Sequence, residues 1–194
     1  MAKYQQGLHE RLVELARATP WFFGALVAVR ELGLSSWCIG AGAVRNLVWD
    51  ASHNAARPSH LEDIDVAYFD PSNITAERDA QLQSQLAASH PGMPWEVTNQ
   101  AGVHLWFERL FGHPVEPLSS LEEAVASWPE YATSVGITLD AQHALRVIAP
   151  HGLEDLFSIV VRHNPTRTSI DTYRRRVAQK RYAERWPKVR IVLP

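Results

Sequence analysis

Cysteine, net charge and long hydrophobic runs are all scarce in this chain, and each shortage excludes a class of protein. The 194 residues include one cysteine, Cys38, so neither an intramolecular disulfide framework nor a cysteine-based zinc site can form. The formal net charge is −2, which removes the simplest argument for nucleic-acid binding, a globally basic chain. The apolar run 21–29 contains Gly24 and ends at Arg30, so it is too short to span a bilayer. We therefore expect a soluble cytoplasmic protein in a reducing compartment.

Two catalytic classes also lack their signatures. The nine histidines are scattered, without the H-E-x-x-H spacing or any comparable ligand spacing of a zinc enzyme. There is no G-x-S-x-G nucleophile motif, and the apolar neighbours of Cys38 are typical of a buried thiol. We expect no zinc site and no covalent serine or cysteine catalysis.

The N-terminal part alternates between helical and strand patterns, and 46% of the residues are hydrophobic, enough to enclose a core. Leucines at helical spacing predict a first helix, and Thr19 followed by Pro20 predicts the start of a second that runs to about Leu32. The next predicted elements, in order, are the strand SSWCI, the helix AVRNLVWDA, the strand DIDVAYFD, the helix ITAERDAQLQSQLAAS, the strand PWEVTN and the helix VHLWFERLF, which ends at Gly112.

The part after Gly112 has a mixed pattern. Two overlapping capping boxes, Ser119 with Glu122 and Ser120 with Glu123, precede the helix LEEAVASW. Two strands, ATSVGITL and ALRVIAP, a short helix, GLEDLFSIVV, and a long basic helix from about Ser169 to Trp186 follow. We expect a core at 1–112 and a C-terminal extension at 113–194, packed together as one continuous globular unit.

The stretch EDIDVAYFD carries the first candidate site. In a strand, Asp63 and Asp65 point to one face, while Ile64 and Val66 point to the other. Two neighbouring carboxylates repel each other unless a cation lies between them, and magnesium prefers carboxylate and water oxygens. An exposed strand edge with solvated acids gives the same pattern, so this motif needs its context.

The sequence Gly40-Ala41-Gly42, at a strand-to-helix junction, supplies that context. Small residues there allow backbone N–H groups and a helix N-terminus to approach a phosphate. The turn is neither the dinucleotide fingerprint, which requires a third glycine where Arg45 stands, nor a P-loop, which requires a Gly-Lys-Ser/Thr ending. Arg45 could bind a phosphate oxygen or form a surface salt bridge, and Asn46 is expected to face a polar site or solvent.

A third carboxylate, Glu96, alternates with Trp95 and Val97 in the next predicted strand. If that strand lies beside the first, Glu96 joins Asp63 and Asp65 in one site. The alternative is an ordinary amphipathic strand with a solvated acid.

Taken together, GAGAVRNLVWD, DIDVAYFD, WEVTNQ, GLEDLF and YRRRVAQKR resemble a bacterial nucleotidyltransferase-like family within the DNA polymerase β-like nucleotidyltransferase superfamily. The resemblance covers nearly the whole chain. It implies an α/β (α+β) fold, in which a small mixed sheet is flanked by helices and a mixed C-terminal extension ends in a long basic helix. The family's third-strand motif continues Asn-Gln-Ala-Arg-Met-His, whereas this chain has NQAGVH at 99–104, so a basic side chain is missing there.

The resemblance implies a metal-dependent enzyme that moves a nucleoside monophosphate (NMP) from a nucleoside triphosphate (NTP) to an acceptor hydroxyl and releases pyrophosphate. Asp63, Asp65 and Glu96 would form the catalytic and metal site for two magnesium or manganese ions, with Glu96 helping to activate the acceptor. The residues implied in nucleotide binding are Gly40, Ala41, Gly42, Arg45 and Asn46.

The implied partners are an NTP and an acceptor that is RNA, protein or a small molecule, with no membrane partner. The competing hypothesis is a non-catalytic nucleotide-binding or interaction module on the same fold. The intact pair of Asp63 and Asp65 favours the enzyme, because loss of one acid would be the simplest sign of a dead site.

The C-terminal basic segment has two interpretations. Arg174, Arg181 and Arg185 fall near one another at helical spacings and could contact a triphosphate or an RNA acceptor. The aromatic residues that would then stack on bases are Tyr173, Tyr182 and Trp186. We favour the alternative, a solvated amphipathic helix that packs these aromatic side chains onto the core.

Overall fold

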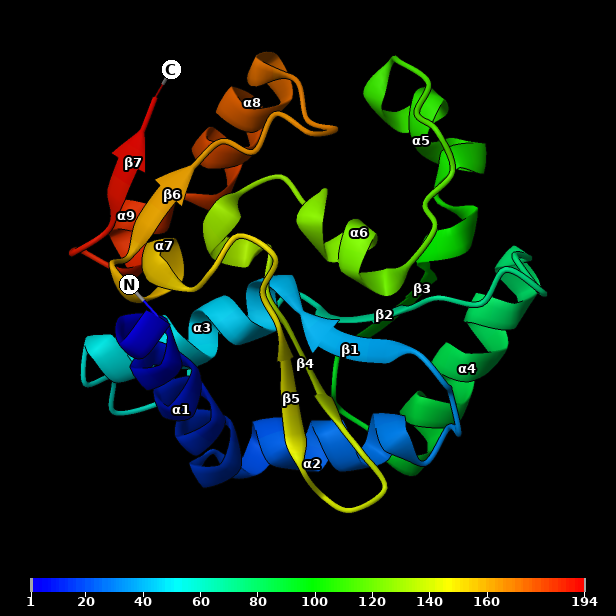
Figure 1. Ribbon diagram of the computed structural model, residues 1–194, viewed down its shortest axis with the longest axis horizontal. Helices are drawn as coiled ribbons and strands as arrows, with labels where there is room; N and C mark the ends of the chain where they lie inside the picture. Colours follow the sequence, from blue (N-terminus) through cyan, green and yellow to red (C-terminus); the bar gives the residue numbers. More distant parts are fainter. Residues whose placement is uncertain (1, 194) are drawn as a thin grey trace.

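A five-stranded mixed sheet lies at the centre of the computed structural model, which describes residues 2–193 (Figure 1). The strand order is β3-β2-β1-β4-β5, in which β2 and β3 are parallel and the other neighbours are antiparallel. The strands are β1 Trp37–Gly40, β2 Ile64–Tyr68, β3 Trp95–Asn99, β4 Gly136–Leu139 and β5 Leu145–Ile148. A mixed sheet flanked by helices confirms the predicted fold class.

Helices cover both faces of this sheet (Figure 1). One face carries the N-terminal helices, which pack on the strands: α1 Ala2–Ala18, α2 Pro20–Arg30, α3 Ala41–Ser52 and α4 Ala76–Ser89. Beyond the other face lie α5 His104–Phe111, α6 Leu121–Ala126 and α8 Ile170–Lys180. The remaining elements are α7 Glu154–Phe157, α9 Tyr182–Arg185, the 3-10 turns Gln100–Gly102 and Tyr131–Thr133, and the parallel pair β6 Val160–Arg162 and β7 Arg190–Val192.

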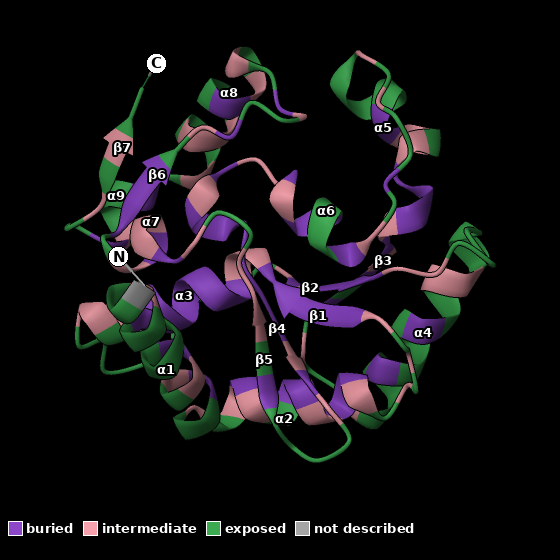
Figure 2. Cartoon of the chain, in the orientation of Figure 1, coloured by how far each residue is buried: buried purple, intermediate pink, exposed green. Residues whose placement is uncertain are grey.

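Alternation along the strands separates the main core from the second face. Ile64, Val66 and Tyr68 of β2 are buried in the main hydrophobic cluster. Cys38 and Ala67 point the other way, into a smaller cluster against α6. Figure 2 shows that β1, β2 and most of α3 are buried, so the centre of the sheet is enclosed on both faces. Cys38 is completely buried, as its neighbours predicted.

Two expectations for the C-terminal region are wrong. The helix expected over GLEDLFSIVV ends at Phe157, because Ile159 adopts a positive φ of 56° and the β-branched residues after it form β6. The helix expected to reach Trp186 breaks at Arg181, which is left-handed with φ 49° and ψ 45°. This break allows α9 to bury Tyr182, and the chain then continues into β7, a strand that was not predicted.

Within residues 2–193, no single helix combines the length and hydropathy needed to cross a bilayer. The segment from Lys3 to Ala18 and α2 reach that length and composition only as a pair bent by 88°.

Glycines at facing positions bring β1 and β4 together. Gly40 pairs with Gly136 across the two strands. A Cβ on Gly40 would lie 2.5 Å from the Trp128 ring and 2.9 Å from the Val135 carbonyl oxygen. Gly40 is therefore required by packing, since a methyl group would overlap both atoms.

We expect Gly40→Ala to lower the free energy of unfolding by about 1–3 kcal/mol, the usual effect of overpacking a filled site. Urea unfolding followed by circular dichroism measures the change. Gly42→Ala is the matched control, because a Cβ there meets its nearest neighbours at 3.6 and 3.8 Å, which is ordinary contact. Equal losses of stability in the two variants would contradict the packing role of Gly40.

Candidate active site

Three carboxylates face one cavity on the side of the sheet away from the main core. The parallel register places Asp65 of β2 directly beside Glu96 of β3, and Asp63 lies two residues before Asp65 on the same side. All three line a polar cavity of 220 Å³. The other lining residues are Gly42, Arg45, Asn46, His60, Leu61, Glu62, Arg176, Lys180 and Arg185. The structure thus brings together the three acids that the sequence selected.

Two of the acids have a raised affinity for protons. Burial, followed by the charges of Asp63 and Glu96, raises the pKa of Asp65 from its ordinary value of 3.8 to about 7, against the opposing effects of the Arg176 charge and the Gly42 backbone N–H. The side chain of Glu96 is exposed on one side, and its partial burial and the charge of Asp63 raise its pKa. Among residues 2–193, no group of three histidine, cysteine, aspartate or glutamate side chains forms a ready metal-binding cluster. The cavity nevertheless concentrates carboxylate charge that a cation would neutralise.

The three residues of the Gly40-Ala41-Gly42 turn have different surroundings. Gly40 lies against Trp128, and the Ala41 N–H donates to the Val135 carbonyl oxygen at 3.2 Å. Ala41 adopts a positive φ of 49°, uncommon for a residue with a side chain. Only Gly42 of the three lines the polar cavity.

Arg45 is a buried cation without an acidic partner. Its side chain is 4% exposed, and it forms no ion pair among the described residues. The guanidinium carbon lies 5.1 Å from the ring centre of Trp186 and 5.2 Å from that of Tyr182. Burial lowers the pKa of Arg45, and its Nε has no hydrogen-bond partner. A buried guanidinium in this state has unused capacity to bind an anion.

Asn46 connects Arg45 to the loop before β2. Its Oδ1 accepts a hydrogen bond from Arg45 Nη2 at 2.8 Å, and its Nδ2 donates to the His60 carbonyl oxygen at 3.4 Å. Asn46 is 1% exposed and lines the cavity, so it faces a polar site rather than solvent.

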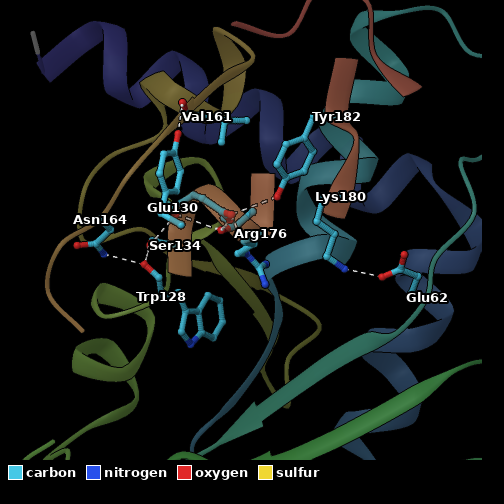
Figure 3. A network of polar contacts seen from close by, with 11 residues as sticks. Glu62, Trp128, Glu130, Ser134, Val161, Asn164, Arg176, Lys180 and Tyr182 are labelled. Atoms are coloured by element: carbon cyan, nitrogen blue, oxygen red, sulfur yellow. Dashed lines mark hydrogen bonds and ion pairs between the residues drawn. The ribbon is translucent and has the colours of Figure 1, made fainter. Parts of the chain in front are cut away.

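An ion pair with a buried carboxylate fixes a second cation beside the acids. Glu130 is 1% exposed and accepts from Arg176 Nε at 2.7 Å, from Tyr182 Oη at 3.2 Å and from Thr133 Oγ1 at 2.8 Å. Figure 3 shows Glu130, Arg176 and Tyr182 converging, with the pair of Lys180 and Glu62 lying apart. Glu130 raises the pKa of Arg176 although burial alone lowers it, so the guanidinium stays charged.

The basic C-terminal segment divides between the cavity and solvent. Arg185 lines the cavity, whereas Arg174 and Arg181 are exposed. Arg174 pairs with Asp171 of α8, and Arg181, at the break between the helices, pairs with Glu184 of α9. The sequence analysis did not select Arg176 or Lys180, which also line the cavity. Helical spacing could have identified them, because they follow Tyr173 by three and seven residues and so lie on the same face of the helix.

The aromatic residues of that segment belong to the core. Tyr173, Tyr182 and Trp186 are each 1% exposed or less, so they cannot stack on an RNA base. The packing interpretation is therefore confirmed for these three side chains.

A largely apolar cavity of 270 Å³ adjoins the polar one at the acids. It shares Asp65, Glu96 and Arg176 with the polar cavity. Its aromatic lining residues are Trp106, Phe107, Phe111 and Trp128. No sequence motif marked this cavity, since its walls come from segments that are separate along the chain.

Comparison with known proteins identifies the family. A family model described as nucleotidyltransferase matches residues 27–191. The chain belongs to this nucleotidyltransferase family. An NMR structure described as a CCA-adding enzyme head domain is 28% identical, with a TM-score of 0.81, and the match covers 95% of this nucleotidyltransferase and 96% of that chain. A comparison with curated protein sequences finds no significant match.

Larger enzymes share the fold of this nucleotidyltransferase. The Thermotoga maritima CCA-adding enzyme complexed with tRNA is 14% identical with a TM-score of 0.56, and the match covers 94% of this chain and 42% of that one. A CCA-adding enzyme solved with CTP is 15% identical with a TM-score of 0.57, with 95% and 43% covered. This nucleotidyltransferase therefore spans less than half the length of these two enzymes.

The raised pKa of Asp65 predicts a pH-dependent loss of stability in the ligand-free protein. A carboxyl with a higher pKa in the folded state binds its proton more tightly there, so the free energy of unfolding falls as pH rises from about 4 to 7. We expect Asp65→Asn to remove this contribution, so that its Tm relative to wild type increases from pH 4 to pH 8. Calorimetric melting in EDTA measures the difference. Asp171→Asn, at an exposed site, is the control, and equal pH profiles for the two variants would contradict the assignment.

Removal of the Glu130 carboxylate should destabilise the fold. Glu130→Ala leaves Arg176 without its partner, and breaking a buried pair in this way costs about 3 kcal/mol. Urea unfolding measures the loss. Glu62→Gln, which breaks the exposed pair with Lys180, should cost less than about 1 kcal/mol. Similar costs for the two variants would show that Glu130 does not anchor Arg176.

Proposed function

We propose that this protein is a magnesium-dependent enzyme that transfers an NMP from an NTP to an acceptor hydroxyl, with pyrophosphate as the second product. One observation carries the proposal: Asp63, Asp65 and Glu96 share a cavity with Gly42 and with Arg45, whose buried guanidinium has no acidic partner among the described residues and has a free Nε. Carboxylates suit a divalent cation, and a buried guanidinium without an acidic partner suits a phosphate. Family membership supports nucleotide transfer in general.

The donor set fits magnesium. Proteins usually bind this ion through one or two carboxylates together with substrate phosphates and water, rather than in a closed protein cage. Asp63 and Asp65 supply two carboxylates, and the charges of Asp63 and Glu96, which add to burial in raising the pKa of Asp65, are charges that a cation would offset. When bound, the ions would neutralise the negative charge that develops on the phosphate oxygens.

The residues of this chain then divide the remaining tasks. The acceptor oxygen attacks the α-phosphorus, and the bond from that phosphorus to the oxygen leading to the β-phosphate breaks, so pyrophosphate leaves. Glu96, whose pKa is raised by burial and by Asp63, accepts the hydroxyl proton. Arg45 and Arg176 hold phosphate oxygens, because both guanidinium groups are fixed in the cavity before a ligand binds.

The 3′-terminal hydroxyl of tRNA is the first acceptor to test. Related folds of this kind have been solved in complex with tRNA, ATP and CTP. Their identities to this chain are 14–16%, so they guide the choice of substrate for the assay without assigning it.

The decisive measurement is calorimetric binding of each of the four NTPs with magnesium or with EDTA, combined with an assay of pyrophosphate release. We expect magnesium-dependent binding to the wild type. In Asp63→Asn/Asp65→Asn, binding should weaken at least tenfold, about 1.4 kcal/mol, because both proposed ligands are removed.

The matched control is Asp171→Asn/Glu184→Gln, which removes two exposed carboxylates outside the cavity. This control should bind NTPs as the wild type does. Magnesium-independent binding with no pyrophosphate release toward any acceptor tested would instead support a non-catalytic nucleotide-binding module. No binding of any NTP would overturn the proposal.

A further inference from the structure

Two cavities of opposite chemistry meet at the acids. The polar cavity is surrounded by charged side chains, whereas aromatic and aliphatic side chains dominate the apolar one. Asp65, Glu96 and Arg176 belong to both, so they form the boundary. A single ligand that fills both cavities must carry charged or polar groups at one end and an apolar surface at the other.

The walls of the apolar cavity suit a flat ring. Along α5, the Trp106 and Phe107 rings are nearly parallel, with a 27° angle and 6.5 Å between centres. Phe107 also packs against Phe111, with centres 4.4 Å apart. Trp128, in the loop after α6, also lines the cavity. Such aromatic surfaces stack favourably on planar heterocycles of any kind, because each heterocycle has a π face.

The cavity also holds an unpaired donor. Arg167 lines it, and its Nη1 is buried without a hydrogen-bond partner. The other end of the group is fixed, because Nη2 donates to the Glu116 carbonyl oxygen at 2.5 Å. A guanidinium only donates, so the ligand that completes this site has a hydrogen-bond acceptor on its edge. A purely aliphatic ligand would leave Nη1 unsatisfied, which is costly in a buried site.

We propose that the apolar cavity binds the nucleobase of the NTP, stacked on the aromatic wall with a ring nitrogen or carbonyl oxygen facing Arg167. This inference rests on the proposed function, which places the triphosphate in the adjoining polar cavity. The cavity volume of 270 Å³ lies just below the range typical of drug-sized ligands, which suits one planar ring system. The base is then held by α5 and by the loop before α8, and the phosphates by α3, α8 and α9.

The test compares NTPs with inorganic tripolyphosphate, which carries the same phosphate chain and no base. Trp106→Ala should raise the Kd of the NTPs about tenfold, the effect of losing one base-stacking surface, and leave the Kd of tripolyphosphate unchanged. Arg167→Gln should change the ranking of the four NTPs without affecting tripolyphosphate. Calorimetry in magnesium measures all these affinities. Leu105→Ala is the matched control, because this neighbour of Trp106 is 63% exposed and does not line the cavity.

The outcomes separate the two proposals. If tripolyphosphate binds and both variants bind all four NTPs as the wild type does, the base lies elsewhere and the inference is overturned, while the proposed function stands. If the wild type binds neither tripolyphosphate nor any NTP, both proposals are overturned. If Trp106→Ala loses its cooperative melting transition, Phe111→Ala replaces it, since Phe111 is 38% exposed and its truncation disturbs the core less.

Discussion

Strand alternation in β2 and β3 is the constraint on which the rest of the site depends. Because neighbouring residues point to opposite faces, burying Ile64 and Val66 in the core forces Asp63 and Asp65 toward the other face. The parallel register then fixes Glu96 beside Asp65. A slip of one residue would bury carboxylates in the main core, so the same apolar contacts that stabilise the sheet also determine where negative charge accumulates.

Positive charge on this face comes from two parts of the sequence, α3 and the C-terminal helices, and is held before any ligand binds. Arg176 is oriented by the buried carboxylate of Glu130, and Arg45 is surrounded by aromatic rings that give it no charged partner. The two arrangements leave different amounts of positive charge available to the cavity. Arg176 is largely neutralised by its partner, whereas Arg45 keeps its charge available to the cavity, which makes it the stronger candidate for holding a phosphate.

The sequence predicted the elements that depend on local pattern and failed where tertiary contacts decide. The period of β2 selected Asp63 and Asp65, the alternation in β3 selected Glu96, and the glycine turn before α3 directed attention to Arg45. The break at Arg181 was not predictable, because it follows from burying Tyr182 and Trp186 beside Trp49, a contact between residues far apart in sequence. The apolar cavity could not be predicted for the same reason. Gly40, which the sequence suggested as part of a phosphate-binding turn, instead packs against Trp128.

The separation of the two charges along the chain has a consequence for biosynthesis. The ribosome delivers residues 63–96 before the residues from Arg176 to Trp186. Until that later segment emerges, the carboxylates of the nascent chain have only Arg45 beside them, and Arg45 lacks two of the rings that enclose it. The N-terminal strands can pair during synthesis, but the polar cavity is complete only after Arg185 has emerged. On the proposed function, the growing chain has no complete nucleotide site until both segments are present.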